Sequence, residues 1–547
     1  MTETPPPDPL PRRGRGPGAS HGGQRSLALP WQGRRPDGAP AGARERGLRA
    51  AGWTGPLLVA LLACGHARRP PEGAGDDAGP LGAGFDAGPG FVTASGGHLV
   101  DDKDGEILLR GFDLSGRDKT PPYFPGLDLP DGGFVEWSPA GVAPLLSYGL
   151  NTVRFLISWE ALEPQRGVFD EAYLDHVVAW VQGLSAQGFW VIVDMHQDLY
   201  SSAFDGIGNG CPAWTCPAEN YRAFDATYDG GAWFAQYATP PITACFDHLW
   251  HDGDGVQEDF AAAWARVAAR LSGEPRVLGY DLLNEPWAGS ANAGDGTFGA
   301  ELLQPFYEKL MAAIRAVDHN HLFFLEPAAW TVDTLSPSGM RFSRGDVVYF
   351  PHYYDMGEQI TGRYSGAATT AAAFQYFARE AGDIGHIPWA LGEFGTTIGN
   401  PEYGEEISDV LQQVDALSGG LCWWDENVDR ATGTGDPTLI AMDGGEDCSG
   451  GLCPLDFLAR PRPLRVAGRL ESFAWDAGAG TASLSFTASD AAGTTDVALP
   501  GAAWAGGPRV ESGDPAGWSG SWDAVRSVYH YTASGPGPHT LVLRRPR

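Results

Sequence analysis

Seven acidic side chains stand at or just beyond the ends of short apolar runs in this sequence: Asp194, Asp198, Glu285, Glu326, Glu393, Asp425 and Glu426. Two carboxyl groups that act together can cleave a glycosidic bond, because one donates a proton to the leaving oxygen while the other attacks or assists at the anomeric carbon. Position in the sequence alone does not select the pair, and any of these groups could instead hold a structural salt bridge. The choice between these interpretations depends on which strands and loops contain the acidic residues.

Apolar runs alternate with helical patterns along the middle of the chain. The runs are Ile107–Phe112, Asn151–Ile157, Phe189–Asp194, Val277–Leu283, Leu322–Leu325, Val347–Phe350, Ile387–Leu391 and Leu421–Trp424. Near-continuous apolar strands joined by helices indicate a parallel sheet covered by helices. Eight repeats predict an α/β fold of the closed (β/α)8 type, a TIM barrel, rather than an open doubly wound sheet. No Gly-rich phosphate loop follows the first run, which disfavours dinucleotide binding.

The active site of such a barrel lies at the C-terminal ends of its strands. Glu285 follows the fourth run and Glu393 the seventh. Because these strands face each other across the ring, we predict that the two carboxyl groups flank one sugar ring. Arg154, His196 and His352 also lie in or just after apolar runs, and a purely structural barrel would not gather carboxylates, histidines and indoles at one rim. The rim is therefore predicted to be a site.

The hydrophobic pattern of the sequence changes after Leu458. From there, short segments with alternating apolar and polar residues are separated by Gly, Pro and Asp. This pattern is typical of a small β-sandwich. We expect the catalytic barrel in residues 89–457 and the sandwich in residues 458–547. No catalytic constellation is apparent in the second of these regions.

The N-terminal part of the chain predicts export. Residues 1–47 are rich in Pro, Gly and Arg, so we interpret them as disordered or as a wrongly assigned start. Arg44, Arg46 and Arg49 precede a short apolar run that ends at Cys64. The run is far below the ~20 residues that span a bilayer, but residues 48–64 fit a signal peptide. The end of this run resembles a bacterial lipoprotein processing site, with a plain secretory signal as the alternative. Residues 65–88 are predicted to be a flexible linker, and the protein a cell-envelope lipoprotein or a secreted protein.

Charge and cysteine content limit the partners and the cofactors. The formal net charge of −31 over 547 residues argues against a nucleic-acid partner, since phosphate binding needs a basic face. Apart from Cys64, six cysteines remain, and an even number in an exported chain suggests disulfides. Cys211 with Cys216 and Cys448 with Cys453 could each close a local loop. Zinc is the weaker alternative, because the spacing is not C-x2-C and no His cluster stands beside either pair.

Two motifs resemble a known family of barrel enzymes. Asn284-Glu285-Pro286 after the fourth run and Glu393-Phe394-Gly395 after the seventh are similar to the cellulase-like glycosidases that include glycoside hydrolase family 5. The resemblance extends to Arg154, His196, His352, Tyr354 and a Trp on the eighth strand. It implies a retaining glycosidase, whose two carboxyl groups lie about 5–5.5 Å apart.

Three further stretches resemble endoglycoceramidases: Arg110–Lys119, Asp194–Ser201 with a following Trp214, and Arg460–Gly468. Members of that family release intact oligosaccharide from ceramide and carry a C-terminal β-sandwich. The resemblance covers roughly residues 91–547. It departs at the eighth strand, where Trp423 and Trp424 are adjacent and either could be the sugar platform; we favour Trp423.

The residues and the resemblance together suggest roles. Glu285 is expected to be the acid/base and Glu393 the nucleophile, with Arg154 and Tyr354 orienting Glu393. The other expected roles are a 2-hydroxyl contact for Asn284, sugar binding for Lys119, Asp198 and His196, and support from His352. Packing alone remains the alternative for both histidines, and a solvated loop charge remains the alternative for Lys119. His196 and Asp198 could suggest a metal, but a glycosidase of this type needs neither a metal nor a cofactor.

Three functions remain open at this point. The first is a retaining endo-β-glycosidase that acts on glycosphingolipids by double displacement. The second is another family 5 β-glycosidase, of the glucosylceramide or steryl-glucoside type or a β-glucanase. The third is a non-catalytic carbohydrate-binding lipoprotein, against which both Glu positions argue. Association with a membrane surface is expected through the substrate or the lipid anchor, and the sequence does not indicate an oligomeric state.

Overall fold

The computed structural model describes residues 85–225, 233–397, 399–428, 437–448, 451–490, 493–514 and 516–546. The predictions for residues 1–47 and 48–64, including Cys64, and most of the predicted linker lie outside these residues. Within the described part of the chain, no helix combines the length and the apolar character needed to cross a membrane.

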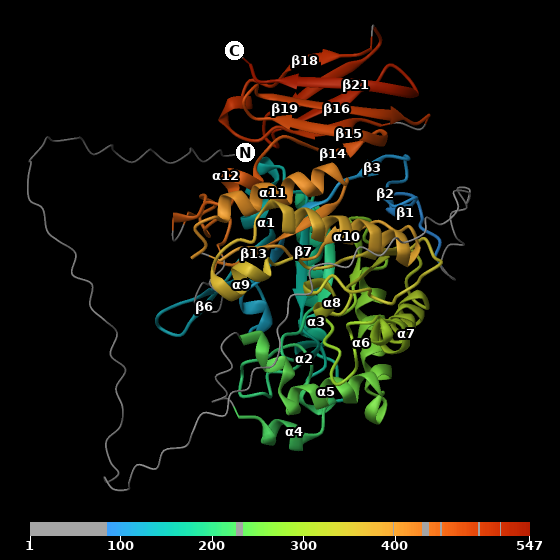
Figure 1. The fold of residues 1–547 in the computed structure, drawn as a ribbon, viewed down its shortest axis with the longest axis vertical. Coiled ribbons are helices and arrows are strands. Elements are labelled where there is room, and N and C mark those ends of the chain that lie inside the picture. The colour runs from blue at the N-terminus through green and yellow to red at the C-terminus, as the bar shows by residue number, and fades with distance from the viewer. Residues whose placement is uncertain are drawn as a thin grey trace, which may run out of the picture. The chain divides into compact units, whose positions relative to one another are not determined.

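Eight parallel strands form the central sheet, and each corresponds to one predicted apolar run (Figure 1). They are β4 (Arg110–Leu114), β7 (Thr152–Ile157), β8 (Trp190–Met195), β9 (Val277–Asp281), β10 (Leu322–Leu325), β11 (Val347–Tyr349), β12 (Ala390–Leu391) and β13 (Gly420–Glu426). The sheet order places the last two strands beside the first, with β13 paired to β4. Two isolated parallel bridges complete the ring: Tyr349 with Trp389 joins β11 to the segment before β12, and Tyr353 with Phe394 joins the segments that follow these strands. The predicted (β/α)8 barrel is confirmed.

Strand pairing depends locally on small residues. A Cβ atom at Gly279 of β9 would lie 2.1 Å from the carbonyl oxygen of Leu322, well inside contact distance, so only glycine allows β9 and β10 to approach this closely. A Cβ atom at Gly111 of β4 would similarly lie 2.6 Å from the Thr152 carbonyl oxygen.

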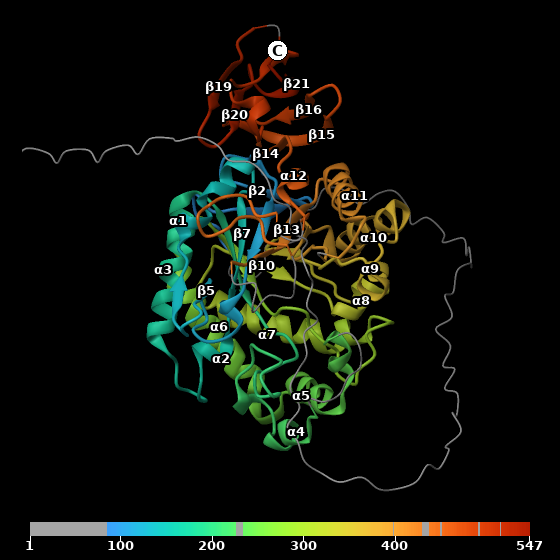
Figure 2. The same cartoon turned by 90° about the vertical axis from the view of Figure 1, so that its left-hand side faces the viewer.

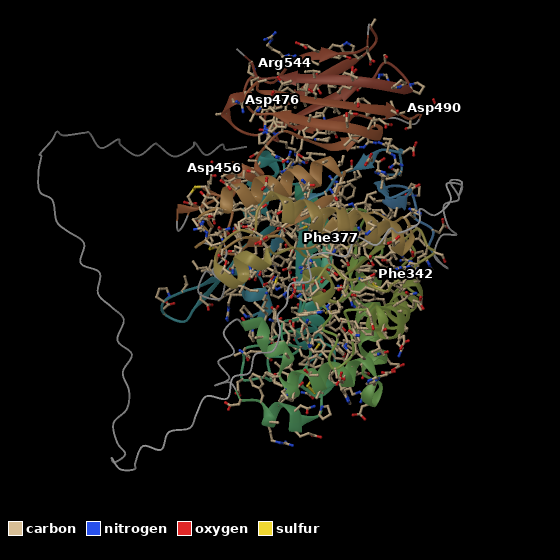
Figure 3. The ribbon with its side chains drawn as sticks, viewed as in Figure 1. Phe342, Phe377, Asp456, Asp476, Asp490 and Arg544 are labelled. Atoms are coloured by element: carbon tan, nitrogen blue, oxygen red, sulfur yellow. A yellow bond between two sulfur atoms is a disulfide. The ribbon has the colours of Figure 1, made fainter. Side chains whose placement is uncertain are left out.

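Long amphipathic helices cover the outside of the barrel: α3 (Glu171–Gln187), α6 (Val256–Leu271), α7 (Gln304–Arg315), α10 (Ala367–Gly385) and α11 (Tyr403–Ala416). Helix α3 begins where the Asp170 side chain accepts hydrogen bonds from the Ala172 and Tyr173 amides, and it ends at Gly188 with φ 108°, as expected for an N-cap and a left-handed C-cap. Figure 3 shows the side chains between helices and strands, among them Phe342 and Phe377, which are buried.

The longest connecting segments of the barrel follow the C-terminal ends of the strands. They contain the hairpin of β5 (Gly126–Asp128) and β6 (Phe134–Glu136), and the short helices α2 (Trp159–Leu162), α4 (Ala218–Ala223), η4 (Trp233–Ala238), α5 (Pro240–Trp250), α8 (Ala329–Asp333) and α9 (Met356–Thr361). These segments build the rim on which the predicted site residues lie.

The C-terminal region forms two antiparallel sheets. One contains β14 (Arg462–Val466), β17 (Thr495–Ala498), β20 (Val528–Thr532) and β19 (Ser519–Asp523); the other contains β15 (Gly468–Asp476), β16 (Thr481–Ala488), β21 (Gly537–Arg544) and β18 (Arg509–Ser512). Trp504, Phe486 and Tyr531 are buried between them. The predicted β-sandwich is therefore present.

The sandwich joins the barrel at the end where the strands begin (Figure 2). Its first sheet continues through β3 (Glu106–Ile107), β2 (His98–Val100) and β1 (Thr93–Ser95), and β3 leads directly into β4. Arg526 of the sandwich donates a hydrogen bond to the Gln187 carbonyl at the end of α3. The described chain also enters at this end, because the Asp86 amide donates to His319 just before β10. The C-terminal ends of the strands are left clear of the sandwich.

Two disulfides are present among the described residues, and one differs from the prediction. Cys448 pairs with Cys453 as predicted. The predicted pairing of Cys211 with Cys216 is wrong, because Cys216 pairs with Cys245 of α5, 29 residues further along the chain. The disulfide joins the loop after β8 to the helix that packs beneath it. Cys211 and Cys422 are buried free thiols.

Candidate active site

A single buried guanidinium, that of Arg154 on β7, organises the floor of the site. Its Nη1 donates to Glu393 Oε1 at 2.8 Å, its Nη2 to Asn284 Oδ1 at 2.8 Å and to Glu326 Oε1 at 3.1 Å, and its Nε to Asp281 Oδ2 at 2.8 Å. Burial alone would lower the pKa of Arg154, but the surrounding carboxylates raise it well above its usual value. Arg154 therefore stays charged and fixes groups from several strands in one geometry.

Two aspartates beneath Arg154 carry their protons more readily than ordinary carboxyl groups. Burial raises the pKa of Asp113 and of Asp281 well above the usual range, and the nearby Glu393 and Glu326, respectively, add to this. Asp113 Oδ2 and Asp281 Oδ1 are buried and have no hydrogen-bond partner among the described residues. The raised pKa of each group favours the neutral form, which limits the excess of negative charge around one guanidinium, since burying an unpaired carboxylate is costly.

Glu285 and Glu393 converge at the rim, as predicted from their positions after the fourth and seventh strands. One carboxylate oxygen of each and a ring nitrogen of His352 all lie within 4.8 Å of one another. The His352 Nδ1 lies 3.1 Å from Glu285 Oε1 and 3.5 Å from Glu393 Oε2. The Tyr354 hydroxyl donates to Glu393 Oε2 at 2.8 Å. His352 therefore contacts both carboxyl groups, which packing alone would not require.

The surroundings move the two carboxyl pKa values in opposite directions. Burial, together with the negative charge of Glu393, raises the pKa of Glu285, although His352 acts against this. Burial would also raise the pKa of Glu393, but the positive charges of His352, Arg154, His196 and Lys119 outweigh it and lower that pKa. A pair of carboxyl groups separated in this way supplies a proton donor and an ionised partner at the same pH.

The backbone at Glu285 has a conformation that non-glycine residues rarely adopt, with φ 43°. The Glu285 amide donates to Glu326 Oε2 at 2.8 Å, and Gln197 Nε2 donates to the carbonyl oxygens of Asn284 and Glu285 at 2.9 and 3.2 Å. Such strain persists only where the surroundings hold it. Here Glu326 and Gln197 hold the side chain of Glu285 toward Glu393.

A second polar group lies beside the carboxyl pair and contains Lys119, His196, Asp198 and Trp424. Lys119 Nζ lies 2.9 Å from Asp198 Oδ2 and 4.2 Å from the centre of the Trp424 ring. The His196 ring stacks on Trp424 at 5.7 Å, and its nitrogens lie 2.8 Å from Asp194 and 3.3 Å from Asp198. Lys119 is thus part of the site and not a solvated loop charge, and the cation beside Asp198 is its ammonium group.

The preference for Trp423 as the sugar platform is wrong in this structure. Trp423 is fully buried, its indole nitrogen donates to the Pro437 carbonyl, and its ring packs edge-on against Phe394. Trp424 instead faces Lys119 and His196.

Three residues of the floor were not predicted from the sequence: Asp113, Gln197 and Asp281. Asp113 and Asp281 lie within apolar strands and point into the barrel, where they bond to Arg154. The signal that could have identified them is a charged residue inside a strand that is otherwise buried on both faces. Gln197 lies between His196 and Asp198, and nothing in its immediate sequence distinguishes its role.

Among the residues that the structure describes, two groups of three side chains are close enough to hold a metal ion: Glu285, His352 and Glu393, and Asp194, Asp281 and Glu326. In the second group the Arg154 nitrogens already lie 2.8 to 3.1 Å from all three carboxylates. In the first, His352 lies against both carboxylates. Each set of ligands is therefore already engaged by a nitrogen group of the protein.

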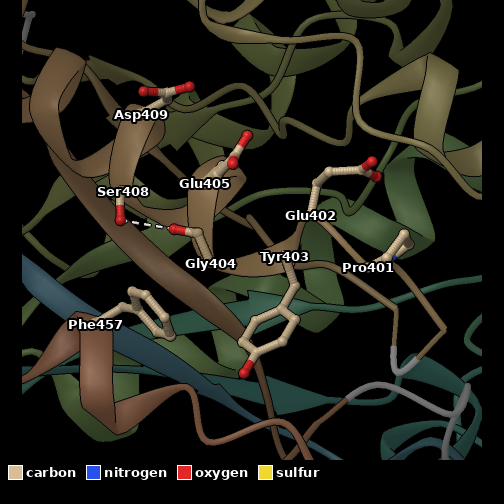
Figure 4. Close-up of a pocket in the computed structure, with 8 residues that line it drawn as sticks. All are labelled: Pro401, Glu402, Tyr403, Gly404, Glu405, Ser408, Asp409 and Phe457. Carbon is tan, nitrogen blue, oxygen red and sulfur yellow. Dashed lines mark hydrogen bonds between the residues drawn. The ribbon is translucent and has the colours of Figure 1, made fainter.

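A separate surface hollow of about 620 Å³ is lined by residues 401–405, Ser408, Asp409 and Phe457 (Figure 4). Ser408 donates to the Gly404 carbonyl, and the Tyr364 hydroxyl donates to Asp409. None of the predicted site residues lines this hollow. It contains no pair of facing carboxyl groups held by a buried cation, so we place the chemistry at Glu285 and Glu393.

Comparison with known proteins gives a consistent picture. The family model described as Cellulase (glycosyl hydrolase family 5) matches residues 142–430. Endoglycoceramidase I of Rhodococcus hoagii is 28% identical over 476 residues, which is 83% of this chain and 88% of that protein. A glucosylceramidase of Cryptococcus neoformans is 28% identical over 249 residues, 36% of this chain and 33% of that protein.

Solved structures of endo-glycoceramidase II from Rhodococcus sp. superimpose on the chain with 28% identity. The structure described as a lactosyl-enzyme intermediate has a TM-score of 0.68 and is covered over 100% of its length, with 82% of this chain. The structure described as a ganglioside GM3 complex has a TM-score of 0.69, with coverage of 99% and 82%. The similarity includes both the barrel and the C-terminal sandwich.

Proposed function

Because the chain belongs to glycosyl hydrolase family 5, we propose that it is a retaining endo-β-glycosidase that releases intact oligosaccharide from the ceramide of glycosphingolipids. The observation that supports this most directly is the approach of the Glu285 and Glu393 carboxylates to within 4.8 Å. A separation this short suits direct attack by one carboxylate, because an inverting enzyme needs about 6.5–9.5 Å to admit a water. The similarity to endoglycoceramidases over most of both chains supports the lipid substrate.

In the first step, Glu393 attacks the anomeric carbon while Glu285 donates its proton to the leaving oxygen. The lowered pKa of Glu393 favours its ionised form, and the raised pKa of Glu285 favours its protonated form. The bond to the aglycone breaks as the bond to Glu393 forms, so the product is a covalent glycosyl-enzyme. Arg154 and Tyr354 each hold one oxygen of Glu393 and so fix the direction of attack.

In the second step, Glu285 accepts a proton from a water molecule that attacks the anomeric carbon and displaces Glu393. The configuration of the sugar is retained. Once the sugar ester has formed at Glu393, that negative charge is lost and no longer raises the pKa of Glu285. Glu285 is therefore more readily ionised at this stage and can accept the proton of the water. His352, which contacts both groups, is placed to share a hydrogen bond with whichever of them is ionised.

Sugar binding is assigned to the polar group beside the carboxyl pair. Trp424 offers the indole face for stacking, and Lys119 and Asp198 offer one donor and one acceptor for hydroxyl groups. The carbonyl oxygen of Asn284 is held by Arg154, and its amide nitrogen donates one hydrogen to the Gln197 carbonyl oxygen at 2.9 Å. The second N–H of that amide is assigned to the 2-hydroxyl contact that strengthens in the transition state. His196 orients Asp198 and packs on Trp424.

A panel of digests tests the substrate class. We expect thin-layer chromatography to show free oligosaccharide and ceramide from a ganglioside, with little product from cellulose oligomers. The Glu393→Gln variant serves as the inactive control. Release of glucose alone, from glucosylceramide only, would contradict the proposal and favour a β-glucosidase of the type represented by the fungal relative.

The cellular location is proposed from the sequence of residues 48–64, with Cys64 as the lipid attachment site of an envelope lipoprotein. The two disulfides support export, since such bonds persist in oxidising compartments. Mass spectrometry of the membrane fraction is expected to show a lipid-modified N-terminal Cys64. Cys64→Ala should move the protein to the soluble fraction; an unmodified Cys64 in the secreted protein would favour the plain secretory signal.

A further inference from the structure

Large apolar side chains that are exposed gather at one end of the barrel. The described residues contain ten that are at least 36% exposed. Leu129 and Val135 lie on the β5–β6 hairpin, Phe234 on η4, Trp330 and Leu335 at α8, and Ile360 on α9. We call these six the apolar rim. All of them are on segments that follow the C-terminal ends of barrel strands.

The opposite end of the molecule has far fewer exposed large apolar side chains among the described residues. Val168 and Ile207 also follow barrel strands, so only Val317, which lies after α7, and Val525 of the sandwich are elsewhere. Single exposed apolar residues are ordinary on soluble proteins, but here most of them lie on the segments around one face, and such a concentration is typical of an interaction surface. That face contains the carboxyl pair.

Part of the apolar rim lies on the side of the site that receives the leaving group. The Ala329 amide at the start of α8 donates a hydrogen bond to the carbonyl oxygen of Pro286 at 3.3 Å, which places α8 beside the catalytic acid. Trp287 packs against Tyr237 of η4 with ring centres 5.3 Å apart, which places η4 on the same side. Since Glu285 protonates the leaving oxygen, Phe234, Trp330 and Leu335 flank the exit of the aglycone.

We propose that the apolar rim docks the catalytic face onto an uncharged lipid surface, such as a bilayer or micelle of zwitterionic lipids that carries the substrate. This inference rests on the proposed function. Docking would let a two-chain aglycone leave and return to lipid without crossing water. Trp330, half exposed at 50%, is the residue type that prefers the boundary between lipid and water.

Charge favours an uncharged surface over an anionic one. The chain has a formal net charge of −31, and the β5–β6 hairpin itself carries Asp128, Asp131 and Glu136. Anionic headgroups would repel these groups. The same charge disfavours a second copy of the chain as the partner, because two acidic faces would meet.

Binding to phosphatidylcholine vesicles without any glycolipid tests the docking independently of catalysis. We expect the full chain to float with the vesicles. The triple variant Leu129→Ser, Val135→Ser, Ile360→Ser should bind about tenfold more weakly, since each residue loses apolar area that lipid would bury. Trp330→Ser with Leu335→Ser should have a similar effect. The matched control Val317→Ser with Val525→Ser, which changes exposed apolar residues away from the rim, should bind like the parent.

Kinetics separate docking from catalysis. The triple variant should hydrolyse a soluble aryl β-glycoside within twofold of the parent, which also shows that it is folded, and should lose about tenfold on glycolipid in vesicles. Equal flotation of the triple variant and the control would overturn the inference, as would sedimentation showing that the rim residues hold a dimer together. Normal flotation without hydrolysis of any glycolipid would instead contradict the proposed function and leave the docking surface supported.

Discussion

Replacing Glu393 with Gln is expected to lower kcat/KM on a soluble aryl β-glycoside by about 10⁵-fold, in the range seen when a covalent nucleophile is removed. The amide has nearly the shape of the carboxylate, and its single oxygen can still accept the hydrogen bond from Arg154, while its NH2 group replaces the oxygen that accepts from Tyr354, so the fold should be retained. What is lost is the negative charge that attacks the anomeric carbon. Steady-state kinetics together with the melting temperature would check both statements.

Tyr354→Phe is the matched control for this variant. It removes one hydrogen bond to Glu393, worth about 1.5–3 kcal/mol for a bond to a charged group, so we expect a loss of about 10–100-fold and no more. A 2-fluoro glycoside should also leave a covalent sugar on the peptide that contains Glu393. Substantial hydrolysis by the Gln variant, or a first product with the inverted anomer, would show that Glu393 is not the nucleophile.

Replacing Glu285 with Ala should have an effect that depends on the leaving group. With a poor leaving group such as a lipid alcohol, protonation of the oxygen is essential, and we expect a loss of about 10²–10⁴-fold in kcat/KM. With an activated aryl leaving group, the first step should be largely spared. Breakdown of the glycosyl-enzyme would then be slow, because the base for the water is also gone, and a burst of released aryl alcohol should appear. Equal losses on both substrates would speak against Glu285 as the acid.

The pH profile gives a second measure of the same residue. Activity requires Glu393 ionised and Glu285 protonated, so kcat/KM of the parent falls at low pH as Glu393 gains a proton and at high pH as Glu285 loses one. The lowered pKa of the first and the raised pKa of the second widen the active range in between. On the activated substrate, Glu285→Ala should lose the basic limb and keep the acidic one. A basic limb that persists would belong to another group.

The barrel could be predicted from the sequence because its strands are buried on both faces and read as continuous apolar runs. Leu322–Leu325 matches β10 at both ends. The predicted run Ile387–Leu391 is longer than β12, which forms a ladder only at Ala390 and Leu391. A ladder depends on where the neighbouring strand begins, and Trp389 meets β11 only through one bridge. The hydrophobic pattern of a strand does not show where the neighbouring strand begins.

The catalytic pair could be predicted because strand number and strand end place a residue on a barrel rim. The choice between Trp423 and Trp424 could not, because the pairing of β13 with β4 shifts register between Trp423 and Glu426. Simple alternation of side chains fails across such an irregularity. The Cys216–Cys245 disulfide was missed for a related reason: it depends on how a long loop folds over a helix, and spacing along the chain does not report that.

The place where the described chain begins has a consequence for how the protein would work in a cell. Phe85 packs on the guanidinium of Arg315, and the Asp86 amide bonds to His319, so the polypeptide arrives at the base of the barrel, on the side away from Glu285 and Glu393. A lipid at Cys64, if it is present, would therefore connect to the barrel at the end opposite the carboxyl pair, so the point of attachment would not obstruct the entry of substrate.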